Sequence, residues 1–193
     1  MARTFKVALA AVVSALALAG NAQAAGGNYV FDRGTVAEQA QVRAALNASA
    51  FPWSLVPRQV TIHIGVYGTS HALPGHIYLD GGLLDAGRFA WATVQDEYAH
   101  QVDFFLFDAA TRTRLTTELG AKDWCYGVAG LGHGEYGCER FASTLVWAYW
   151  PSKDNAYRPE SKQDESAAMS PARFRALMAT LVGAPRGTTG ARV

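Results

Sequence analysis

The sequence predicts an α+β domain in which a small mixed or antiparallel sheet packs on one long helix and further helices follow. Two strand-like segments, Val60–Tyr67 and His76–Leu79, come before the middle of the chain. Helical apolar periodicity dominates after Arg88. Strands followed by a run of helices are typical of this class, and 193 residues are enough for one domain with a real core.

The first half of the chain carries clear local signals. Thr35–Ala48 is helix-like, and Thr35 and Glu38 have the spacing of a capping box. The segment Val60–Tyr67 alternates β-branched residues, as a half-buried strand does. A turn-rich connection, Gly68–Gly75, leads to the second strand.

A long helix is expected from about Arg88 to Asp108. Its core stripe recurs at helical spacing and consists of Trp91, Val94, Tyr98, Val102 and Phe105. Its opposite face mixes apolar and ionisable residues, namely Phe89, Asp96, His100, Asp103 and Phe107. Such a helix is expected between a core and a cleft.

Three further helices are expected in the second half. They are a short polar helix at 111–121, an apolar helix at 136–150, and a last helix from Ser170 to near Gly183. Ser170 suits the N-cap and Pro171 the first helical position. We expect residues 184–193 to form a disordered tail.

Residues 1–24 have the features of a secretory signal peptide. Arg3 and Lys6 precede an apolar run of 13 residues, and Ala22 and Ala24 fit a cleavage site. The run is too short to span a bilayer of about 30 Å, although an uncleaved anchor is the alternative. We therefore expect a secreted or periplasmic mature chain, residues 25–193, that forms a single domain without membrane contact.

Charge and cysteine content narrow the class further. The chain has 17 basic and 16 acidic residues, so no basic excess indicates nucleic-acid binding. Its two cysteines, Cys125 and Cys138, would meet an oxidising compartment after export, which favours one disulfide. The alternative, a metal site that uses both thiols, lacks a nearby histidine pair.

The candidate chemistry lies inside the long helix. Asp96 and His100 are four residues apart and therefore share one helix face, with Glu97 beside them. This is the arrangement of the His-Glu-x-x-His zinc motif with Asp in place of the first His. At the start of the later apolar helix, Glu135 and Glu139 have the same four-residue spacing.

The stretch from His76 to Trp150, with the run Glu135-x-x-x-Glu139-Arg140-Phe141-Ala142 in its second helix, resembles zinc peptidases of the gluzincin type. The resemblance covers fewer than half of the residues. It implies a zincin-like fold, Glu97 as the general base and a metal held by three ligands. Those ligands would be Asp96, His100 and Glu135.

Four neighbouring residues receive supporting roles. The resemblance implies that Glu139 braces the first ligand. Asp103, one turn beyond the motif histidine, is expected to accept a hydrogen bond from His100. His133 or Tyr136 is expected to stabilise an oxyanion, so His133 joins Glu97 as a catalytic candidate.

Asp96 is a departure from the zinc motif. A set of two carboxylates and one imidazole leaves Zn²⁺ near zero net charge, so it would acidify a bound water less than a two-histidine site. We still expect Zn²⁺, although oxygen-rich ligands also suit Mn²⁺, Mg²⁺ or Ca²⁺. The remaining histidines are less specific: a solvent-facing or hydrogen-bonded His63 is favoured over a ligand, whereas His71 and His76 are candidates for a cleft wall.

The resulting hypothesis is a monomeric, secreted metallopeptidase that acts on a peptide or protein substrate. One alternative is a degenerate zincin-fold module that binds peptide or protein without hydrolysis. Another is an unrelated exported protein in which Asp96, Glu97 and His100 form only a structural cluster.

Overall fold

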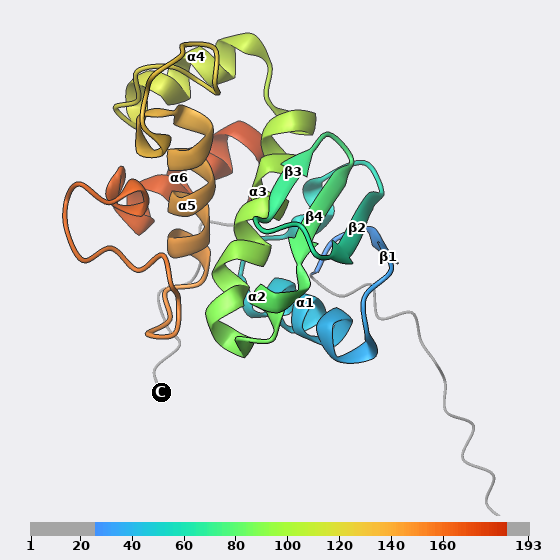
Figure 1. The fold of residues 1–193 in the computed structure, drawn as a ribbon. Helices are drawn as coiled ribbons and strands as arrows, with labels where there is room; N and C mark the ends of the chain where they lie inside the picture. Colours follow the sequence, from blue (N-terminus) through green and yellow to red (C-terminus); the bar gives the residue numbers. More distant parts are fainter. Residues whose placement is uncertain (1–25, 185–193) are drawn as a thin grey trace, which may run out of the picture.

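A computed structural model describes residues 26–184 of the chain (Figure 1). The predicted signal peptide, 1–24, and all but the first residue of the predicted tail lie outside the described residues. The described part is α+β, as predicted, with one mixed sheet and helices that follow it. Within 26–184, none of the helices combines the length and apolar character that a membrane span requires.

The sheet has the strand order β1-β2-β4-β3. Strands β1 (Tyr29–Asp32), β2 (Val60–Gly65) and β4 (His76–Asp80) are mutually parallel, whereas β3 (His71–Leu73) runs antiparallel to β4 at the edge. Side chains alternate across the pleat, so one face of β2 and β4 is buried and the other faces solvent.

Two helices cover the buried face of the sheet (Figure 1). Helix α1 (Val36–Ala48) begins at the predicted capping box of Thr35 and Glu38. Helix α3 (Trp91–Leu106) continues a 3₁₀ turn, Gly87–Ala90, and is the long helix predicted from the sequence. The shared core is apolar and includes Val42, Leu46, Ile62, Ile64, Ile77, Leu79, Val94, Tyr98 and Val102.

The later helices pack on the other side of α3. Helix α4 (Ala109–Glu118) follows it directly, α5 (Gly137–Tyr149) packs along it, and α6 (Pro171–Val182) packs on α5. The one-turn helix α2 (Gly81–Leu84) and three short 3₁₀ turns complete the described elements; the turns are Trp53–Leu55, His133–Glu135 and Glu165–Ala167. Helix α5 is thus held between α3 and the last helix.

Two strands were not expected from the sequence. Strand β1 is only four residues long, and β3 has three residues inside the segment predicted as a turn-rich connection. Strands this short carry too few positions for a period of two to be recognised. The second, β3, is an edge strand and packs beside α3.

Candidate metal centre

Helices α3 and α5 bring four ionisable side chains together below the protein surface. Asp96, Glu97 and His100 project from the middle of α3, and Glu139 comes from the first turn of α5. Each is only 6% to 8% exposed. Burial of so many ionisable groups is costly unless they are paired with one another or with a metal ion.

Three of these side chains converge on one point. His100 Nε2 lies 3.9 Å from Asp96 Oδ2 and 3.5 Å from Glu139 Oε2. One ligand atom from each residue lies within 4.8 Å of the other two. Ligands about 2.0–2.2 Å from a tetrahedral ion stand roughly 3.3–3.6 Å apart, so the two distances from His100 are close to those expected around a divalent cation.

The set contains Glu139 where Glu135 was expected, and this corrects the ligand set inferred from the sequence. Glu135 lies in the 3₁₀ turn before α5, is ion-paired with Lys122, and accepts a hydrogen bond from Gly132 N at 2.7 Å. The reason is the helix start: α5 begins at Gly137, so Glu135 and Glu139 do not share one helical face. Among the described residues, Glu135 belongs to no cluster that could hold a metal ion.

His133 lies at the mouth of the site. Its Nε2 is 3.1 Å from Glu139 Oε2, and its Nδ1 is 2.8 Å from Glu165 Oε1. Glu139 therefore lies between two imidazoles, His100 and His133. The His133 side chain is 60% exposed, so it can reach a molecule in the cleft.

Asp103 has a different role from the one expected. It accepts hydrogen bonds from Arg112 Nε at 2.8 Å and from Trp124 Nε1 at 3.1 Å. No hydrogen bond to His100 is among those of the described residues. Asp103 thus ties α3 to α4 and to the segment that carries Cys125, and it supports the site from a distance.

The cluster perturbs the protonation of its members. Burial raises the pKa of Asp96 well above its ordinary value, and it raises the pKa of Glu97 to about 7 although His100 opposes this. Burial would lower the pKa of His100, but hydrogen bonding to Glu139 and the charge of Asp96 raise it to about 9. Burial would raise the pKa of Glu139, but its bonds with both histidines hold it well below the usual range.

The predicted disulfide is present. Cys125 and Cys138 are bonded, with 5.4 Å between their Cα atoms. Cys138 immediately precedes Glu139, so the bond fixes the first turn of α5 to the loop that contains Tyr126. Since the sulfurs are bonded to each other, they are not metal ligands here.

Two tyrosines at the site were not identified from the sequence. Burial and the neighbouring charge of Glu139 raise the pKa of Tyr126, and this residue has a left-handed backbone, with φ 54°, a conformation that non-glycine residues adopt mainly at constrained positions. Tyr157 lies next to Asp96, and its pKa is raised by burial and by that carboxyl group. Neither residue lies in a periodic segment, although the neighbouring Cys125 was a signal for Tyr126.

Tyr136, the other expected oxyanion donor, does not face the cluster with its hydroxyl. Its hydroxyl donates to Val128 O at 2.7 Å, and its ring lies 4.3 Å from that of Tyr126. Tyr136 therefore supports Tyr126 and leaves the hydroxyl of Tyr126 as the one beside Glu139.

A cleft opens over the cluster. It has a volume of about 380 Å³ and is bounded by the β3 edge, by α3 and by the loop of Tyr126, with Ser70, His71 and Ala72 on the sheet side. Of the two histidines that were candidates for the cleft wall, His71 lines the cleft and His76 is not among its lining residues.

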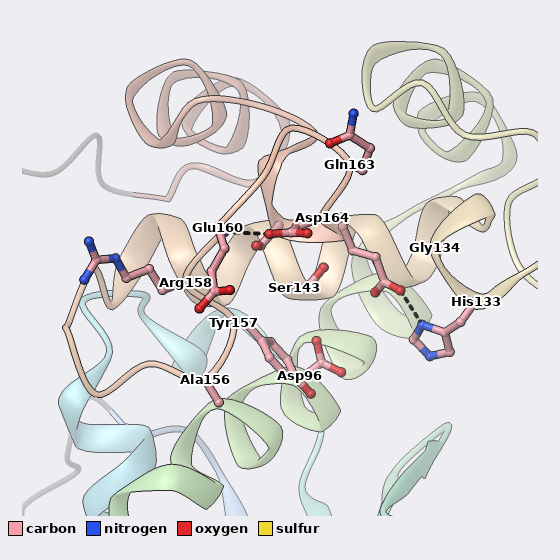
Figure 2. Close-up of a pocket in the computed structure, with 12 residues that line it drawn as sticks. Asp96, His133, Gly134, Ser143, Ala156, Tyr157, Arg158, Glu160, Gln163 and Asp164 are labelled. Atoms are coloured by element: carbon pink, nitrogen blue, oxygen red, sulfur yellow. Dashed lines mark hydrogen bonds and ion pairs between the residues drawn. The ribbon is translucent and has the colours of Figure 1, made fainter.

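A second cavity, of about 600 Å³, adjoins the cluster through Asp96 and His133 (Figure 2). Its far wall is the segment from Ala156 to Ser166. Figure 2 shows Tyr157 next to Asp96 on one wall. Asp96 therefore borders both cavities.

Comparison with known proteins gives no matching family model, no similar curated protein and no similar solved structure. The functional argument consequently depends on the geometry of the site itself.

Proposed function

We propose that this protein is a secreted or periplasmic metal-dependent peptidase. In this proposal Asp96, His100 and Glu139 hold one divalent cation, and Glu97 is the general base. The observation that carries the proposal is the convergence of three buried donors from two helices beside an open cleft. A buried carboxylate–imidazole group at the wall of a cleft is a common feature of catalytic sites.

Each side chain at the site would have its own role in hydrolysis. When bound, a divalent cation would polarise a carbonyl oxygen and make a water molecule more acidic. Glu97 lines the cleft without belonging to the ligand group, so it would take a proton from the attacking water and return it to the leaving amine. Tyr126 and His133 line the same wall; Tyr126 would donate its hydroxyl to the oxyanion, and His133 would do so after releasing Glu139 or Glu165.

A peptide is the substrate class that the surroundings favour. Strand β3 is the edge of the sheet, and residues 70–72 line the cleft. An extended peptide binds such an edge through backbone hydrogen bonds, as an added strand. This would lay the scissile bond across α3, close to Glu97.

Asp96 also supports a second candidate, a binding module without catalysis. Two carboxylates neutralise the charge of the cation, and a neutralised cation activates water weakly. Replacing Asp96 by His restores the positive site and separates the two candidates. If D96H raises both zinc affinity and casein hydrolysis, the native chain is a weakened enzyme; if only zinc affinity rises, the binding module is favoured.

Titration calorimetry of the mature protein, first stripped with a chelator, tests the metal site directly. We expect one equivalent of Zn²⁺ or Mn²⁺ to bind and the melting temperature to rise with metal concentration. Absence of binding and of any thermal shift with both ions would remove the proposed function.

A further inference from the structure

The solvent-facing side of the sheet carries a row of stacked rings. His71 on β3 lies over Tyr78 on β4, with centroids 4.8 Å apart, and Tyr78 lies over His63 on β2 at 4.5 Å. His76 stacks on His63 at 5.3 Å. These contacts hold the imidazole of His63 between two neighbouring rings.

Asp32 on β1 fixes the tautomer of His63. Its Oδ2 lies 2.7 Å from His63 Nδ1, and a carboxylate only accepts, so Nδ1 carries the proton. The lone pair of a neutral His63 is therefore on Nε2. A carboxylate behind a histidine in this way is the usual support of a metal-binding imidazole.

The free nitrogen of His63 faces a second imidazole. His63 Nε2 and His76 Nδ1 are 3.0 Å apart. Two nitrogens about 2.0–2.1 Å from a square-planar or octahedral ion, in adjacent positions, stand roughly 2.8–3.0 Å apart. We infer that His63 and His76 form a second metal site, which takes Cu²⁺ or Ni²⁺ with Asp32 as the positioning residue.

Binding needs a change of tautomer and a turn of the His76 ring. In the metal-free protein, one proton lies between His63 Nε2 and His76 Nδ1. When the ion binds, that proton is carried on Nε2 of His76, so both facing nitrogens present lone pairs. His76 is exposed, so its ring can turn and water can complete the coordination.

The sequence favoured a solvent-facing or hydrogen-bonded His63 over a ligand. A hydrogen bond of His63 is present, but the sequence could not show that β1 places Asp32 on one side of the His63 ring and β4 places His76 on the other. This second site shares no residue with the site of Asp96, His100 and Glu139. It therefore stands or fails independently of the proposed peptidase function.

The test is titration of Cu²⁺ into the folded His100→Ala protein, followed by electron paramagnetic resonance. The His100→Ala substitution removes the buried imidazole, so any nitrogen coupling in the Cu²⁺ spectrum reports on the other histidines. We expect one tight equivalent with coupling to two nitrogens. Replacement of His63 or His76 by Ala should weaken binding at least tenfold, and Asp32→Asn should weaken it about tenfold.

His71→Ala is the matched control, because His71 belongs to the same row but not to the nitrogen pair. Its affinity for Cu²⁺ should stay within twofold. Affinity and coupling that survive the loss of His63, or that fall equally in the His71 variant, would overturn the inference. Circular dichroism of each variant confirms that the compared proteins are folded.

Discussion

Two carboxylate–imidazole clusters within residues 26–184 differ in their surroundings. On α3 and α5, His100 lies between Asp96 and Glu139 at a depth where each is 6% to 8% exposed. On the open face of the sheet, Asp32 and His63 are paired with side chains 49% and 17% exposed. Carboxylate and imidazole groups therefore occur together once in a buried cluster and once in a row on the surface of the sheet.

The difference follows from the elements that carry them. A helix places residues four apart on one face, and a second helix packed against it adds a donor at the same point. Strands place their side chains in rows, so Asp32, His63 and Tyr78 are register partners across the sheet, and His76 lies diagonal to His63, two residues before Tyr78. Two packed helices can bring three donor side chains to one point, as they do for Asp96, His100 and Glu139. The sheet brings together only a pair of imidazole nitrogens, those of His63 and His76.

Loss of the proposed general base, Glu97, should have the largest effect of these changes on peptide hydrolysis. It would show that the buried cluster alone performs the hydrolysis. Glu97→Gln keeps the shape of the side chain but cannot accept the proton, so we expect peptide hydrolysis to fall about 1000-fold. Zinc affinity should change less than threefold, because Glu97 is outside the ligand group. Hydrolysis that persists in this variant would refute the assigned base.

The two clusters should also differ in how much each contributes to the free energy of unfolding. In the metal-free protein, His100→Ala leaves Asp96 and Glu139 buried without their shared partner and should cost about 3 kcal/mol. His63→Ala removes an exposed pair and should cost less than about 1 kcal/mol. Urea unfolding of both variants in the presence of a chelator measures the two costs. Equal costs would mean that burial does not distinguish the clusters.

A smaller effect should appear in the pH dependence of the His100→Ala cost. The pKa of His100 is raised from 6.5 to about 9, so its contribution is fully present below pH 6.5 and is lost as pH rises through about 9. The gap in unfolding free energy between wild type and His100→Ala should therefore narrow between pH 6 and pH 9.5. A gap that widens over this range would contradict the assigned charge state.

Much of the fold was predictable because the signals are local. The capping box at Thr35 fixed the start of α1, and helical periodicity located α3. The motif spacing likewise placed Asp96, Glu97 and His100 on one helix face. These features depend on residues within one or two turns of each other.

The sequence placed Glu135 where the structure brings Glu139 beside Asp96 and His100, because this choice depends on where a helix begins. A difference of two residues at the start of α5 decides whether Glu135 or Glu139 points at α3, and helix boundaries are the least certain part of any pattern. Tyr157 could not be found at all, since it reaches Asp96 from an irregular segment. Such contacts are set by tertiary packing and leave no periodic trace.

The most direct measurement compares zinc affinity in two matched variants, Glu139→Gln and Glu135→Gln. Both changes replace a carboxylate by an amide. Glu135 lies two residues before the start of α5, and Glu139 lies two residues after it. We predict that Glu139→Gln lowers zinc affinity at least 100-fold, whereas Glu135→Gln stays within twofold of wild type. The reverse order, or equal affinities in the two variants, would contradict the metal centre described above.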